Sequence, residues 1–133
     1  MKNVCGRYNR PGLSCYYITD TKDGAKKEVY KHVCEKERSK FTAQIANVKV
    51  DFNIRLLDLS VIKKEYGNFY KYLQNPVAEI NDNWPKEYLL SNYVADCCRV
   101  CGYDGIKYCG DANYCNYVLW KENGLTIISS LDD

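Results

Sequence analysis

Short β-type runs, each bounded by turn signals, alternate with a few helical segments along the whole chain. Apolar and β-branched runs of roughly four to eight residues between turns are typical of strands. We expect strands at residues 14–18, 43–52, 54–59, 106–108, 116–120 and 125–128, and helices at 22–38, 61–72 and 91–101. This mixture predicts an α+β domain in which the strands are segregated from two or three helices.

Local signals indicate where several of these elements begin and end. The segment 10–12, Arg-Pro-Gly, is a turn signal before the first run. Asp20 and Thr21 are suited to cap the first helix, and Ser91 the last one, with Gly102 as its expected C-terminal stop. The buried stripe of the last helix is expected to contain Tyr93 or Val94, Cys97 or Cys98, and Cys101.

Length and charge set broad limits on the kind of protein. A chain of 133 residues suits one small domain with a single core. No stretch approaches the roughly 18 to 20 apolar residues of a membrane span. The net charge of +2 gives no argument for binding nucleic acid or a membrane, although the basic residues gather in segment 1–40. That segment favours an anionic ligand or simply forms a solvated helix face.

Cysteine is the unusual component, with eight in the chain. Five of them lie between positions 97 and 115. Cys98-x-x-Cys101 has the spacing of a zinc knuckle or a redox pair, but no second such pair follows. The opening residues carry no apolar run typical of a secretory signal, so we expect a cytoplasmic chain with reduced, partly buried thiols. A zinc-dependent interaction domain using Cys98, Cys101, Cys109 and Cys115 is a minor alternative.

Several enzyme classes are disfavoured by what the chain lacks. His32 is the only histidine, so a catalytic triad, a Cys–His pair or a His-rich metal site would rest on one residue. There is no phosphate-binding glycine loop and no GxGxxG after a predicted strand. The remaining polar candidates are Arg7 before the first turn, Tyr17 on the first strand and Glu28 on the first helix.

These residues belong to a longer pattern, in which the chain resembles the RES domain family, the toxin half of RES–Xre toxin–antitoxin pairs. The family opens with Gly-Arg-aromatic-Asn, a glycine turn, a tyrosine-containing strand and a helix bearing Glu. The matching residues here are Gly6-Arg7-Tyr8-Asn9, Gly12, Tyr17 and Glu28, and later motifs match residues 54–60, 102–108 and 116–120. The resemblance extends over 1–133, and the early position of Arg7 leaves open whether part of the family's N-terminal segment is missing.

The resemblance implies an ADP-ribosyltransferase-like β core and an NAD-consuming activity. Family members take NAD as substrate, with no further cofactor, and break the bond between nicotinamide and ribose. The ADP-ribose passes to water, phosphate or a protein, so the implied reaction is NAD hydrolysis, phosphorolysis or ADP-ribosyl transfer. A cognate Xre-type antitoxin is the implied partner. Direct binding of nucleic acid or a membrane is not expected, and the oligomeric state is left open.

The resemblance also implies roles for individual residues, and their chemistry suits those roles. Arg7 would grip the diphosphate through its planar guanidinium. Tyr17 would offer a flat face to the nicotinamide or ribose. Glu28 would stabilise the positive charge that develops on the ribose as the bond breaks. Tyr8 and Asn9 complete this binding segment, with Asn9 either holding the arginine loop or serving as a turn residue.

The last third of the chain departs from the family pattern. Relatives usually have a serine in the site just after the strand that ends here at Tyr108. Direct alignment puts Gly110 in that position, and a one-residue slip would offer the thiol of Cys109 instead. Asn116 would orient a ligand or cap the strand entry, and the structural role is favoured. These departures make a catalytically inactive RES-like module, binding NAD or the antitoxin, the alternative to an active enzyme.

Overall fold

A computed structural model describes residues 6–31, 33, 35–40, 42, 44–50, 53–74, 85–109 and 113–120, and the backbone of 125–131. The strands are β1 (Tyr16–Thr19), β2 (Ile45–Val50), β3 (Leu56–Asp58), β4 (Gly105–Cys109), β5 (Cys115–Leu119) and β6 (Leu125–Leu131). The α-helices are α1 (Lys22–Lys31), α2 (Leu59–Glu65), α3 (Gly67–Leu73) and α4 (Leu89–Val100), with short 3-10 helices at Glu35–Lys40 and Lys86–Tyr88. The predicted α+β class is confirmed, with more helices than expected.

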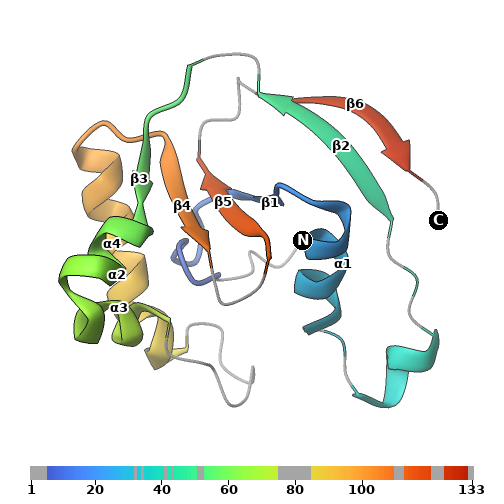
Figure 1. Ribbon diagram of the computed structural model, residues 1–133, viewed down its shortest axis with the longest axis horizontal. Coiled ribbons are helices and arrows are strands. Elements are labelled where there is room, and N and C mark those ends of the chain that lie inside the picture. The colour runs from blue at the N-terminus through green and yellow to red at the C-terminus, as the bar shows by residue number, and fades with distance from the viewer. Residues whose placement is uncertain are drawn as a thin grey trace.

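The strands form two separate sheets (Figure 1). The larger sheet has four strands in the order β1-β5-β4-β3, with β3 parallel to β4 and the other pairs antiparallel. The smaller sheet pairs β2 with β6 in antiparallel fashion. The strands expected at 43–52 and 54–59 therefore both exist, but they pair with distant segments rather than with each other.

The register of the larger sheet determines which side chains share a face. Tyr17 lies opposite Val118, which in turn lies opposite Ile106. Tyr108 lies opposite Asn116 in the next pair on the same face. Because side chains at opposed positions of adjacent strands point to the same side, this face carries two apolar core residues beside three polar ones.

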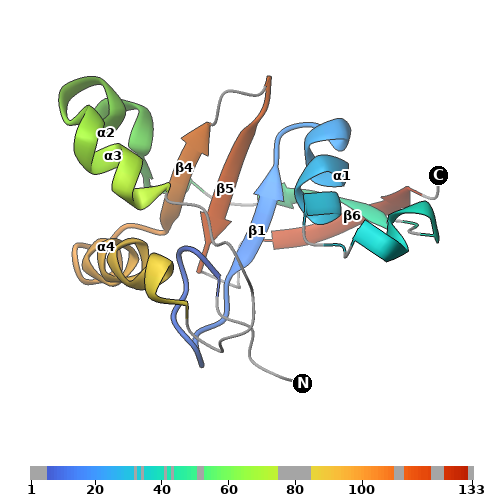
Figure 2. The same cartoon turned by 90° about the horizontal axis from the view of Figure 1, so that it is seen from below.

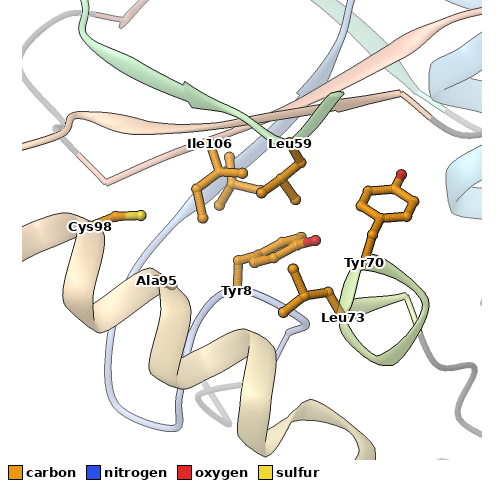
Figure 3. Close-up of a cluster of buried hydrophobic side chains, with 8 residues drawn as sticks. Tyr8, Leu59, Tyr70, Leu73, Ala95, Cys98 and Ile106 are labelled. Atoms are coloured by element: carbon orange, nitrogen blue, oxygen red, sulfur yellow. The ribbon is translucent and has the colours of Figure 1, made fainter. Parts of the chain in front are cut away.

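The hydrophobic core lies on this face of the sheet. Figure 2 shows α2, α3 and α4 on the β4 side of the sheet and α1 on the β1 side. Figure 3 shows Tyr8, from the N-terminal turn, lying between α4 and the Leu73 side chain of α3, below Leu59 and Ile106. The buried cluster comprises Tyr8, Leu59, Tyr70, Leu73, Ala95, Cys98, Ile106 and Val118.

The first helix begins at residue 22 as expected, whereas the second helical region begins at Leu59, two residues before its expected start. Thr21 accepts a hydrogen bond from the Gly24 amide at 3.0 Å, which confirms it as the cap of α1. This helix ends at Lys31 rather than near residue 38. The region 61–72 is helical but is divided at Tyr66 into α2 and α3. Local propensity sets these helix starts, whereas the ends depend on what each helix can pack against.

The last helix corrects two of the predictions and confirms one. α4 begins at Leu89, so Ser91 is not its cap; it is fully buried inside the helix. The buried stripe consists of Ser91, Asn92, Ala95 and Cys98, so only Cys98 was correctly placed as buried, while Val94 is half-buried and Tyr93, Cys97 and Cys101 are exposed. Gly102 ends the helix as predicted, with φ of 84° and the Tyr103 amide bonded to the Cys98 carbonyl at 2.9 Å.

Candidate functional site

The backbone around Arg7 is a tight turn that α4 holds in place. The Gly6 amide donates to the Asn9 carbonyl at 3.1 Å, which closes the turn. Asn92 of α4 donates from Nδ2 to the Gly6 carbonyl at 2.9 Å and to the Arg7 carbonyl at 2.7 Å. The Ser91 hydroxyl also donates to the Arg7 carbonyl. The two buried polar residues of α4 therefore fix the backbone from which the Arg7 side chain projects.

The Arg7 side chain is itself held by contacts from two other segments. Its Nη1 donates to the carbonyl of Leu73, the last residue of α3, at 2.9 Å. The guanidinium carbon lies 5.1 Å from the centroid of the Tyr88 ring, within the range of a cation–π contact. A carbonyl on one side and a ring face on the other orient the guanidinium plane, which suits it to bind an oxyanion.

Tyr17 of β1 is bonded directly to the Arg7 turn. Its hydroxyl accepts from the Tyr8 amide at 3.0 Å and donates to Asn9 Oδ1 at 2.6 Å. Burial raises the pKa of this phenol, so the hydroxyl remains a donor at neutral pH. The residue as a whole is still 45% exposed, which leaves side-chain surface for a ligand. A Cβ at Gly6 would collide with both the Asn9 oxygen and the Tyr17 hydroxyl, so this contact requires glycine.

Asn9 holds the Arg7 turn in place, which is one of the two roles predicted for it. Besides accepting from Tyr17, it donates from Nδ2 to the Leu13 carbonyl at 3.1 Å. It therefore ties the Arg7 turn both to β1 and to the turn that follows. Its side chain is buried, with 5% of the residue exposed, and it acts within the protein.

Tyr8 was predicted to contact the ligand, and the structure corrects this. It is completely buried, and its ring centroid lies 5.1 Å from that of Tyr108. Its hydroxyl accepts from Gln74 Nε2 at 2.8 Å. The turn directs alternate side chains to opposite sides, so Tyr8 enters the core while Arg7 stays outside it.

Glu28 lies on α1 and forms the second half of the site. Three donors converge on its Oε1: Lys31 Nζ at 2.8 Å, the Tyr114 hydroxyl at 2.5 Å and Asn116 Nδ2 at 3.4 Å. Within the described residues, no hydrogen bond reaches Oε2. The side chain is 29% exposed. One carboxylate oxygen is therefore held by three donors, while no described residue bonds the other, and the side chain keeps a partly exposed surface.

These contacts keep Glu28 ionised. Burial by itself raises the pKa of the carboxyl, but the hydrogen bonds from Lys31, Tyr114 and Asn116 outweigh burial and hold the pKa below its usual value. The same hydrogen bond to Glu28 raises the pKa of Lys31. Glu28 is therefore ionised at neutral pH, and its carboxylate forms an ion pair with the Lys31 ammonium.

Tyr108, which was not among the predicted site residues, lies opposite Asn116 and packs its ring against that of Tyr8. Burial raises the pKa of its phenol, the Glu28 carboxylate raises it further, and the Arg7 guanidinium acts in the opposite direction. Tyr108 is thus within electrostatic range of both charged groups. The sequence offers no local signal for Tyr108, because its place opposite Asn116 and on the same face as Tyr17 depends on how the strands pair.

The residues predicted near the end of β4 have mixed outcomes. Cys109 is joined to Cys115 by a disulfide, so the expectation of reduced thiols is wrong for this pair, and neither residue offers a thiol. They lie directly opposite each other on adjacent strands, which places their side chains within reach. Gly110 lies outside the described residues. Asn116 holds the Glu28 carboxylate, which is a structural role other than the expected strand cap.

The alternative of a four-cysteine zinc site finds no support. Two of its members are in the disulfide, and among the residues that the structure describes no three His, Cys, Asp or Glu side chains gather as metal ligands. The four free described cysteines are Cys15, Cys97, Cys98 and Cys101, and burial raises the pKa of Cys98 to about 11.

Among the described helices, none has the length and apolar character needed to cross a membrane.

Comparison with known proteins gives one match. A family model described as the RES domain matches residues 3–131. No curated protein and no solved structure matches the chain. The matched segment contains both the Arg7 turn and the Glu28 cluster, and it spans nearly the whole sequence. The chain therefore belongs to the RES domain family.

Proposed function

We propose that this RES domain cleaves the bond between nicotinamide and ribose in NAD and passes the ADP-ribose to water, phosphate or a protein. Membership of the family supports a toxin-like, NAD-related role in general. The observation that carries the specific proposal is the Glu28 carboxylate, which is ionised, held at one oxygen by three donors and available at the other.

The chemistry of the reaction matches this carboxylate. As the bond to nicotinamide breaks, the electron pair leaves with the nicotinamide nitrogen and positive charge develops on the ribose ring. A nearby negative charge stabilises that transition state, and one fixed before the reaction costs no reorganisation. The available Oε2 of Glu28 would accept a hydrogen bond from a ribose hydroxyl, which aligns the sugar with the charge.

Arg7 supplies the opposite charge that an NAD diphosphate requires. Its guanidinium is oriented by the Leu73 carbonyl and the Tyr88 ring, and Tyr108 lies within electrostatic range of both Arg7 and Glu28. A dinucleotide bound with its diphosphate at Arg7 and its nicotinamide ribose at Glu28 would lie along the sheet face that carries Tyr17. As the family resemblance implies, we place this activity in the cytoplasm, opposed by a cognate Xre-type antitoxin.

The test is nicotinamide release from NAD by the purified protein, with and without phosphate, measured by chromatography. Glu28→Gln keeps the shape of the side chain and removes its charge, and we expect roughly a hundredfold loss or more in turnover. The matched control is Glu65→Gln, at an exposed glutamate of α2, which should leave turnover unchanged. Stimulation by phosphate would identify phosphorolysis rather than hydrolysis.

Two results would contradict the proposal in different ways. Full turnover in Glu28→Gln would remove this carboxylate from the mechanism. Binding of NAD by the wild type in calorimetry, with no nicotinamide released, would instead identify the inactive binding module. Transfer to protein would appear as nicotinamide release only when an acceptor protein is present.

A further inference from the structure

Tyr114, which precedes β5, reaches across to α1 and is almost fully buried there, with 6% of the residue exposed. Its ring lies over Gly24, where an added Cβ would collide with two ring carbons. Glycine at this point of α1 is thus what admits the ring. Since glycine is less favourable than alanine inside a helix, the helix gives up intrinsic stability at the place where Tyr114 packs.

The Tyr114 hydroxyl has a defined direction in the hydrogen-bond network. It donates to Glu28 Oε1 at 2.5 Å and accepts from Lys31 Nζ at 3.4 Å. Burial and the neighbouring Glu28 both raise the pKa of this phenol, so it stays protonated and remains a donor. Short bonds to a carboxylate are the strong ones, and this bond is shorter than those from Lys31 or Asn116.

The backbone next to Tyr114 is held by a covalent bond and two hydrogen bonds. Cys115 is joined to Cys109 of β4 by the disulfide. The Cys115 amide donates to Asp20 Oδ1 at 3.0 Å, and the Asp20 amide donates to the Cys115 carbonyl at 3.2 Å. Asp20 lies just before α1, so the segment that carries Tyr114 is tied to the helix that carries Glu28.

We propose that Tyr114 is a positioning residue, whose hydroxyl fixes Oε1 of Glu28 so that Oε2 is presented to the substrate. Tyr114 contacts no substrate in this arrangement and acts only through Glu28. The proposal extends the proposed function to a residue that the family motifs did not indicate. The effect of Tyr114 on turnover rests on the proposed function, but the pKa of the Glu28 carboxyl can be measured without any turnover.

Tyr114→Phe tests the proposal because it removes the hydroxyl and keeps the ring against Gly24. We expect the pKa of Glu28, followed by NMR titration of its side-chain carboxyl carbon, to rise by about one unit. Turnover near neutral pH should fall about tenfold with KM changed less than about twofold, and the acid limb of the pH profile should move up with the pKa. Among the residues that the structure describes, the other groups that act on Glu28 are Lys31, Tyr108 and Asn116, and all three are retained.

The matched control is Tyr117→Phe. Tyr117 lies on β5 three residues later and faces the other side of the sheet, with its ring 5.9 Å from Lys107 Nζ. This variant should leave the pKa of Glu28 and the kinetic constants unchanged. Tyr114→Phe behaving like Tyr117→Phe in the titration would overturn the proposal. If the wild type releases no nicotinamide either with or without an acceptor protein, the proposed function fails, and the titration alone decides whether Tyr114 positions Glu28.

Discussion

Asn92→Ala should weaken both the fold and the Arg7 turn. Asn92 is a polar residue in the middle of α4, and it is 1% exposed. Its Nδ2 donates to the carbonyls of Gly6 and Arg7 at 2.9 and 2.7 Å. Alanine favours the helix but removes both hydrogen bonds from Nδ2, so any loss of stability reports on the turn rather than on helix propensity.

The size of the stability loss depends on whether the Gly6 and Arg7 carbonyls keep another hydrogen-bond donor in Asn92→Ala. The Arg7 carbonyl still accepts from Ser91, and the Gly6 carbonyl still accepts from the Asn9 amide at 3.4 Å. Neither acceptor is left wholly unpaired, so each lost bond costs about its net value of ~1 kcal/mol. We expect the free energy of unfolding to fall by about 2 kcal/mol, which corresponds to a drop of roughly 7 °C in Tm for a domain of this size.

Urea denaturation followed by tyrosine and tryptophan fluorescence is the assay. Val100→Ala is the control on the same helix, because Val100 is 88% exposed and the change should stay within about 0.5 kcal/mol. KM for NAD should also rise in Asn92→Ala, because the backbone that positions Arg7 is loosened. An Asn92→Ala protein as stable as the Val100→Ala control would refute the reasoning that α4 holds the turn through this side chain.

Two further predictions concern the disulfide and the pH dependence of stability. Replacing Cys109 and Cys115 together by Ser should lower the free energy of unfolding by about 2 kcal/mol, which is the chain-entropy value for so short a loop. Adding a reductant to the wild type should produce the same drop. Equal denaturation midpoints of the wild type with and without reductant would contradict this prediction. The lowered pKa of Glu28 means that its stabilisation is present above the usual carboxyl pKa and is lost as pH falls through the folded-state pKa. The wild type should therefore become more stable than Glu28→Gln as pH rises from acid to neutral, seen as a growing difference between their denaturation midpoints. A difference that does not change with pH would contradict a stabilising role of the hydrogen bonds to Glu28.

The predicted residues Arg7, Tyr17 and Glu28 lie in short local motifs, which is why a sequence pattern could single them out. Tyr17 bonds to the turn that carries Arg7, and Glu28 lies on the next helix. What the motifs did not show is how the two halves are connected. Tyr108 and Tyr114 come from the last third of the chain, and the Tyr114 hydroxyl contacts a residue 86 positions earlier. No local pattern encodes such a contact, because it depends on the order of strands in the sheet.

The sequence by itself determined the features that short-range physics controls. Gly12 and Gly102 adopt the positive φ that other residues avoid, and Thr21 caps the helix that follows it. The alternation of short strands and helices was enough for the α+β class.

Only the tertiary structure decided which side chains of these elements are buried. Ser91 was predicted to cap a helix, yet Ser91 and Asn92 are both buried inside α4, because the Arg7 turn packs there and its carbonyls need donors. Tyr8 reads as a ligand contact, yet it fills the core between α3 and α4. The bonding of Cys109 to Cys115 likewise follows from their opposed register. In each case the deciding partner is brought close by packing, and the energy of that packing outweighs the local preference.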